Sequence, residues 1–116
     1  MNTYIALMNL TEQGVRTMGD SVKRSVKGKA LMKRLGGRIK DYYMTMGQYD
    51  FVVVFECPDD EAMAKFLLAV GAWGAVRSST LKAFPVPTYR RILRALPALE
   101  KPAPKRRRGR RRAAKR

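Results

Sequence analysis

The sequence contains no histidine, which is both the commonest general base and the commonest metal ligand in proteins. Ser-His-Asp and Cys-His catalysis are therefore excluded, as are the usual zinc sites. Cys57 is the single cysteine, so an intrachain disulfide is excluded, and its place at the end of an apolar run predicts a small buried side chain. The nine acidic residues cluster only at Asp59, Asp60 and Glu61. We expect no cofactor and no metal.

Long apolar runs are also lacking. No stretch approaches the roughly 18 residues that a membrane-spanning helix needs. The chain starts Met1-Asn2-Thr3-Tyr4, with no basic segment ahead of its first apolar stretch, so we expect no signal peptide. The sequence therefore predicts a cytoplasmic protein without a membrane span.

Basic residues, by contrast, are abundant: 25 lysines and arginines give a formal net charge of +16. Residues 101–116 contain ten of them and no acid, while the first 100 residues hold the other 15 and all nine acids. Like charges and the absence of large apolar side chains predict that this tail is disordered. We expect a folded domain over residues 1–96 and a disordered Pro/Arg/Lys-rich tail over residues 97–116.

The hydrophobic pattern of the first part predicts alternating strands and helices. Strands are expected at about 4–10, 38–46, 51–55 and 76–84, and helices at about 21–35 (with Asp20 as N-cap), 59–70 and 88–96, the last one stopped by Pro97. The acids at 59–61 then fall in a first helical turn, where they complement the helix dipole. The order β-α-β-β-α-β is typical of an α+β, ferredoxin-like fold with an antiparallel sheet, here with an added C-terminal helix.

The predicted sheet has more apolar surface than its own helices can cover. In this topology the first and third strands are central, and both are apolar on both faces. Two main helices cover only one face of a four-stranded sheet, so the other face needs a second partner. We predict a homodimer, or a higher oligomer, in which two sheets pack face to face; burial by the C-terminal helix is the alternative.

A series of short motifs runs through the domain: Thr3-Tyr4-Ile5, Leu10-Thr11-Glu12-Gln13-Gly14, Leu35-Gly36-Gly37, Thr45-Met46-Gly47-Gln48-Tyr49-Asp50, Pro58-Asp59-Asp60-Glu61 and Val76-Arg77-Ser78-Ser79-Thr80-Leu81. In this order they resemble the GYD domain family, which is named for its Gly-x-Tyr-Asp stretch. The resemblance covers residues 3 to about 95. It implies a dimeric α/β barrel of the ferredoxin-like type, and it implies no function because the family is largely uncharacterised.

The basic residues predict binding to nucleic acid or another polyanion, because arginine forks match phosphate oxygens. The tail has no aromatic residue for base stacking, so we expect no sequence specificity. The alternatives are a solubilising segment, a localisation signal or a tether to an acidic surface. The first long helix adds a second basic stretch, which is either a phosphate-contacting face or merely a solvated one. The candidate nucleic-acid-binding residues are Lys23, Arg24, Lys27, Lys101, Lys105, Arg106, Arg107, Arg108, Arg110, Arg111, Arg112, Lys115 and Arg116.

The Gly-x-Tyr-Asp stretch has two interpretations. One is a turn, in which Gly47 adopts an unusual backbone angle and Asp50 hydrogen-bonds the loop backbone. The other is a ligand pocket in the barrel, lined by aromatic and charged residues, although each of these aromatics also suits an ordinary core or dimer contact. The candidate pocket residues are Tyr4, Tyr43, Tyr49, Asp50, Trp73 and Arg77.

Three hypotheses for the function follow. The first is a non-enzymatic dimeric protein whose basic tail binds nucleic acid without sequence specificity. The second is a small-molecule-binding protein, or a cofactor-independent enzyme, that uses a pocket in the barrel. The third is an assembly module that docks on an acidic partner.

Overall fold

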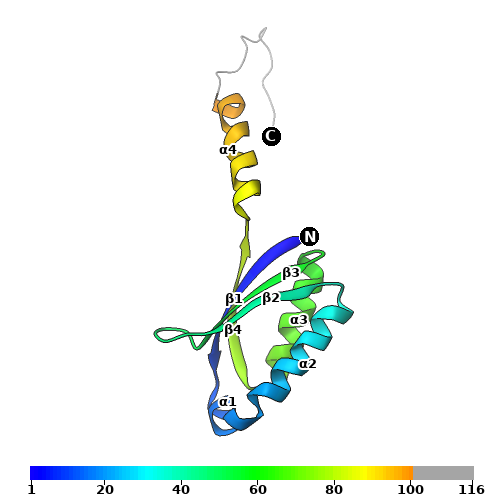
Figure 1. Cartoon of the computed structure of the whole chain (residues 1–116), viewed down its shortest axis with the longest axis vertical. Helices are drawn as coiled ribbons and strands as arrows, with labels where there is room; N and C mark the ends of the chain where they lie inside the picture. The colour runs from blue at the N-terminus through cyan, green and yellow to red at the C-terminus, as the bar shows by residue number, and fades with distance from the viewer. Residues whose placement is uncertain (101–116) are drawn as a thin grey trace, which may run out of the picture. The chain divides into compact units, whose positions relative to one another are not determined.

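The computed structural model describes residues 1–100, so the basic residues predicted to bind polyanions at 101–116 lie outside the described residues. The chain divides into two units, Met1–Phe84 and Pro85–Arg116. Each unit is described by itself. The first contains the whole sheet and its helices, and the described part of the second is a single helix (Figure 1).

The first unit has a four-stranded antiparallel sheet in the order β2-β3-β1-β4. β1 and β3 are therefore the central strands, as the sequence predicts. In Figure 1, α2 and α3 lie on the same side of this sheet. The elements are β1 Asn2–Leu10, α1 Glu12–Arg16, the 3-10 turn η1 Met18–Asp20, α2 Ser21–Arg34, β2 Arg38–Met44, β3 Phe51–Cys57, α3 Asp60–Ala72 and β4 Val76–Ala83. This is the predicted ferredoxin-like order.

The hydrophobic core lies between the sheet and the two long helices. Alternate residues of the central strands point into it, because successive side chains of a strand face opposite ways. Phe55 of β3 packs edge-on against Phe66 of α3, with their ring centroids 5.0 Å apart. Met32 of α2 and Cys57 are fully buried beside them, which confirms the prediction that Cys57 is a small core side chain.

Local signals explain most element boundaries. Gly36 has a positive φ of 89° and ends α2, as a left-handed cap does. Asp59 caps α3 by accepting a hydrogen bond from the Ala62 backbone N–H at 2.8 Å, and Asp60 follows in the first turn. Asp20 stands at the N-cap position of α2 as predicted, but its side chain makes no capping hydrogen bond.

β2 ends at Met44, two residues earlier than predicted, because the next residue already belongs to the turn. The backbone N–H of Thr45 donates to the carbonyl of Asp50 at 2.8 Å, and its hydroxyl donates to the carbonyl of Tyr49 at 2.6 Å. These bonds close the β2–β3 connection. Gly47 lies within it with a φ of 114°, which confirms the unusual backbone angle expected there.

The second face of the sheet carries apolar side chains that no helix of the first unit covers. Ile5 and Leu7 of β1 alternate with the core residues and are partly exposed. Their partners across the β1–β3 ladder, Val54 and Val52, share that face because paired residues of an antiparallel sheet lie on one side. We call this surface, centred on Ile5, Leu7, Val52 and Val54, the open sheet face.

The described part of the second unit is the helix α4, Val86–Glu100. Pro97 lies inside this helix, so the prediction that Pro97 stops it is wrong. A proline removes the hydrogen bond that its own N–H would make and crowds the carbonyl four residues earlier, here that of Leu93. This can kink a helix without ending it, and α4 continues to Glu100. Across residues 1–100, no helix has both the length and the apolar character needed to cross a membrane.

Candidate functional site

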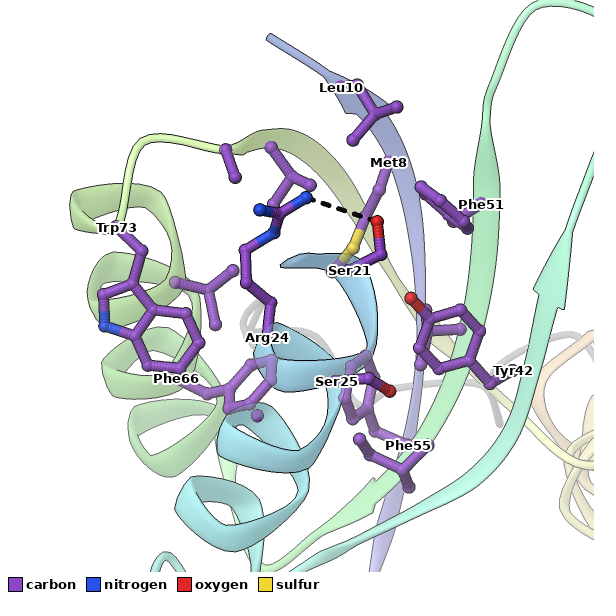
Figure 2. A pocket seen from close by; sticks show the side chains of 16 residues that line it. Met8, Leu10, Ser21, Arg24, Ser25, Tyr42, Phe51, Phe55, Phe66 and Trp73 are labelled. Carbon is purple, nitrogen blue, oxygen red and sulfur yellow. Dashed lines mark hydrogen bonds between the residues drawn. The ribbon is translucent and has the colours of Figure 1, made fainter. Parts of the chain in front are cut away.

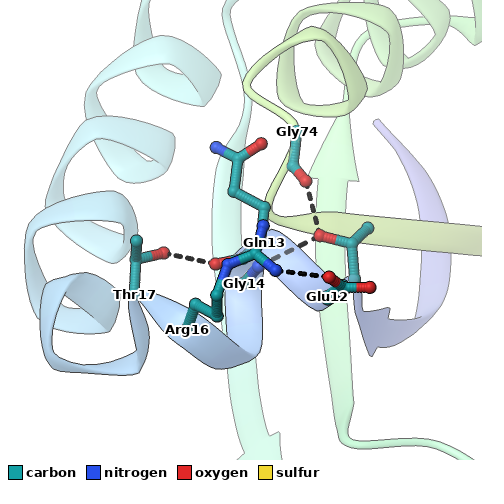
Figure 3. Close-up of polar contacts among 7 residues, drawn as sticks. Glu12, Gln13, Gly14, Arg16, Thr17 and Gly74 are labelled. Atoms are coloured by element: carbon teal, nitrogen blue, oxygen red, sulfur yellow. Dashed lines mark hydrogen bonds and ion pairs between the residues drawn. The ribbon is translucent and has the colours of Figure 1, made fainter.

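Residues 11–14 of the Leu10–Gly14 motif form a structural joint, meaning that their hydrogen bonds connect β1, α1 and the loop before β4 (Figure 3). The Thr11 hydroxyl accepts from the Gly14 N–H at 3.0 Å and donates to the carbonyl of Gly74 at 2.6 Å. The Thr11 N–H donates to the carbonyl of Ala75 at 2.9 Å. A Cβ at Gly14 would lie 2.0 Å from that same carbonyl oxygen, so only glycine fits. This motif therefore maintains the fold.

The Gly-x-Tyr-Asp stretch has a structural role as well. The Asp50 N–H donates to the carbonyl of Met8 at 2.8 Å, and its carboxylate accepts from the Leu10 N–H at 2.9 Å. The turn interpretation predicted that the Asp50 side chain would bond the loop backbone. Its partner is β1 instead, because the connection folds back on the end of that strand. Asp50 thus fixes the β2–β3 connection to the central strand.

A third polar cluster joins β1, α3 and β4. The Tyr4 hydroxyl donates to a carboxylate oxygen of Asp60 at 2.5 Å, and the Lys82 ammonium lies 3.0 Å from the same oxygen. The Tyr4 hydrogen bond, with Lys82 beside it, lowers the pKa of Asp60 below its ordinary value of 3.8. Burial, together with the hydrogen bond to Asp60, raises the pKa of Tyr4 above its ordinary value of 10.0.

This cluster predicts acid sensitivity. The pKa of Asp60 is lower in the folded chain, so its contribution to stability is present above pH 3.8 and is lost as the pH falls through the folded pKa. We expect Tyr4→Phe to reduce the free energy of unfolding near neutral pH, and the difference from wild type to shrink in acid. Urea unfolding between about pH 2 and pH 7 measures the free energies of unfolding of both proteins. A difference between them that stays constant over the whole pH range would contradict the prediction.

Of the six predicted pocket residues, only Trp73 lines the cavity between the sheet and the helices. Tyr4 is buried beside Asp60. Tyr43 pairs with Val52 and Arg77 pairs with Asn9, which places both on the open sheet face. Tyr49 and Asp50 lie in the β2–β3 connection. The predicted residues therefore do not form one pocket.

The cavity lies between the sheet, α2 and α3 and has a volume of about 70 Å³ (Figure 2). Its inner wall is apolar and includes the buried side chains of Val53, Phe55 and Phe66. The lining residues that remain partly exposed include Arg24 and Tyr42, so these side chains mark its mouth. The arrangement is suited to a small ligand with one apolar and one polar end.

Arg24 is the charged group of this cavity. Its Nη1 donates to the carbonyl and the hydroxyl of Thr17, each at 3.1 Å, and its Nη2 lies 3.4 Å from the Ser21 hydroxyl. No carboxylate within residues 1–100 lies within ion-pair distance of it. Arg24 is only partly exposed, and it has no acidic partner among these residues. Its bonds to Thr17 and Ser21 leave other N–H donors of the guanidinium uncommitted.

The predicted basic face of α2 is not a uniform row of free charges. Lys27 places its ammonium 4.2 Å from the centre of the Trp73 ring, a cation–π contact, and Arg24 turns to the cavity, while Lys23 is exposed. The sequence predicts phosphate contact for Arg24, and the pocket that it predicts in the barrel does not include this residue, which lines the cavity. The available signal was the helical spacing of Ser21, Arg24, Ser25 and Gly28, which puts these residues on one face of α2.

Comparison with known proteins identifies the family. The protein-family model described as GYD domain matches residues 4–93. The chain belongs to the GYD domain family. A curated relative from Thermus thermophilus, named glutamine synthetase and cystathionine beta-lyase binding protein, is 34% identical over 87 residues. That alignment covers 74% of this chain and 92% of the relative.

A solved structure supports the fold of this GYD domain. The crystal structure of FFRP-DM1 is similar with a TM-score of 0.53 and 21% identity, covering 72% of this chain and all of that one. The crystal structure of TTHA0845 from Thermus thermophilus gives a TM-score of 0.48 at 21% identity, covering 73% of this chain and 95% of the other. At this identity the likeness to FFRP-DM1 concerns the fold alone.

Proposed function

We propose that this GYD domain is a protein-binding module that docks on an acidic surface of a partner protein. The observation that carries the proposal is the curated relative, which shares 34% identity and is named for binding glutamine synthetase and cystathionine beta-lyase. The motifs of this chain fit such a role, because those around Thr11 and Asp50 hold the fold together and leave the surface free for binding.

The helix α4 is the docking surface that the charges favour. Tyr89, Ile92 and Leu96 share one face of it, and their side chains are 53%, 39% and 38% exposed, far more than core residues. The opposite face carries Arg90, Arg91 and Arg94, and the helix has a single acid at its last residue. The apolar stripe suits an apolar groove of a partner, and the arginines on the other face favour a partner whose surface around that groove is acidic.

The open sheet face supports a second part of the proposal, a homodimer. Ile5, Leu7, Val52 and Val54 form a continuous apolar centre on this face. A second copy of the same sheet provides an equally apolar and self-complementary surface. A dimer would also present two α4 helices, which increases the apparent affinity for a partner that itself has several copies.

Binding to the two enzymes tests the docking surface. We expect the full-length protein to bind purified glutamine synthetase or cystathionine beta-lyase from its own organism in biolayer interferometry at physiological salt. Ile92→Asp should weaken that binding at least about tenfold, because it places a carboxylate in the apolar stripe opposite an acidic rim. Leu68→Asp is the matched control, since Leu68 is 76% exposed on α3 and lies outside α4.

Two outcomes would contradict the proposal. Equal binding by the wild type and Ile92→Asp would exclude α4 as the docking surface. Tight binding to a random-sequence DNA duplex, with no binding to either enzyme, would instead support the nucleic-acid function that the charge of +16 suggests.

A further inference from the structure

The cavity of the first unit combines two features that the protein-binding function does not use. Its inner wall is apolar, and Arg24 with its uncommitted donors marks its mouth. Ser21 and Ser25 also line it, and all three belong to the first turns of α2. The N-terminal end of a 14-residue helix favours anions, since its backbone N–H groups and its dipole present partial positive charge there.

We propose that this cavity binds a short branched-chain carboxylate. The alkyl group lies against Phe55 and Phe66, and the carboxylate is held at the mouth by Arg24 and the hydroxyl of Ser25. The Ser21 hydroxyl keeps its proton on the Met18 carbonyl, at 2.7 Å. The proposal is independent of the protein-binding function, because no residue of α4 contributes to the cavity.

The volume of the cavity sets the size of the alkyl group. At about 70 Å³ it is roughly half of the 150 Å³ or so that accommodates benzene in an apolar protein cavity. That space suits a short alkyl group and excludes larger apolar groups such as a substituted aromatic ring. The wall offers Val53, Phe55 and Phe66 as contacts, and none of these side chains has a polar atom that a ligand must satisfy.

The polar end favours a carboxylate over other anions. A guanidinium presents its N–H groups in a planar fork, which matches the two oxygens of a carboxylate. The absence of an acidic partner within the described residues means that a bound carboxylate would neutralise Arg24 without displacing an existing ion pair. A more highly charged anion such as phosphate would meet one arginine and one available hydroxyl beside an apolar wall, which is too little compensation for its desolvation.

Trp73 makes the proposal directly measurable, because it is the only tryptophan of the chain and it lines the cavity. Titration of the full-length protein with isovalerate should change the Trp73 emission in a saturable way and raise the melting temperature. Isovaleramide has the same shape without the charge, and it should bind at least about tenfold more weakly through loss of the charge-assisted hydrogen bonds. Acetate, which lacks the branched alkyl group, should give no saturable change.

Gly28→Ala is the decisive variant. Gly28 lines the cavity, and a Cβ there would meet only the end of the Phe66 ring, at 3.9 Å. The added methyl group should raise the melting temperature, because alanine favours a helix more than glycine does. It should also occupy part of the cavity and weaken isovalerate binding about fourfold to fifteenfold, since the ligand loses the burial of one to two methylene groups. A rise in stability with a loss of binding cannot result from unfolding.

Arg24→Gln tests the polar end, with Arg34→Gln as its matched control on an exposed position of the same helix. The first should weaken isovalerate binding at least about tenfold and the second should leave it unchanged. The absence of a saturable signal with isovalerate, equal affinity for isovaleramide, or unchanged binding by Gly28→Ala would each overturn the proposal. If Arg24→Gln fails to fold, the Gly28→Ala and isovaleramide results decide the question.

Discussion

Replacement of Gly14 by alanine is expected to destabilise the domain by at least about 3 kcal/mol, at or beyond the usual range for overpacked sites. The Cβ would lie 2.0 Å from the Ala75 carbonyl oxygen and 3.0 Å from its carbonyl carbon. That oxygen is a backbone atom which already accepts the Thr11 N–H, so it has no side-chain freedom with which to move away. The loss is a large share of the roughly 5–15 kcal/mol that stabilises a typical domain.

Gly71→Ala provides the matched control for this substitution. Gly71 lies within α3, and a Cβ there meets nothing within 4 Å. The same chemical change should therefore stabilise the protein slightly, by about 0.5–1 kcal/mol, through helix propensity. Urea unfolding of the wild type and both variants measures the three free energies. Similar free energies for Gly14→Ala and the wild type would show that the joint around Thr11 can open to accept a methyl group.

The second large effect is expected for Leu7→Asp at the centre of the open sheet face. Leu7 lies beside Val52 of β3 and Ser79 of β4. If two open sheet faces pack together, the substitution buries an unpaired carboxylate twice in the same interface. Such a charge costs several kcal/mol, so the dimer dissociation constant should rise on the order of a thousandfold or more. The expected product is a folded monomer.

Light scattering coupled to size-exclusion chromatography, over a range of protein concentrations, measures this change. Leu68→Asp is again the control, because it makes the same substitution on the exposed side of α3 and should leave the dimer intact. A wild-type protein that stays monomeric at high micromolar concentration would overturn the proposed dimer. A Leu7→Asp protein that remains dimeric would place the interface elsewhere.

Features encoded by neighbouring residues were predictable from the sequence. The stretch 51–55 is apolar on both faces, which is typical of a central strand, and β3 is central. Asp59 and the acids after it indicated the start of a helix, and α3 starts there. Gly36 and Gly47 indicated turns, and both have positive φ. In each case the signal and the structure lie within a few residues of each other.

Two predictions made from local sequence failed. The stop expected at Pro97 is wrong, because a proline inside a helix can kink it without ending it, and α4 continues to Glu100. The side chain of Asp50 was expected to bond its own loop, yet it accepts from the Leu10 N–H, 40 positions away in the sequence. Side-chain type showed that Asp50 would accept a hydrogen bond, but not from which strand.

The sequence by itself determined the order of strands and helices, the central position of β1 and β3, the family and the uneven charge. These depend on periodicity, capping and composition, which act over short stretches of chain. Only the tertiary structure decided that Thr11 bonds Gly74, 63 positions away, and that Arg24 lies at a cavity and not on a row of free charges. Such contacts depend on how α2 and α3 pack on the sheet, and packing is set by the fit of many side chains at once, which no short stretch of sequence contains.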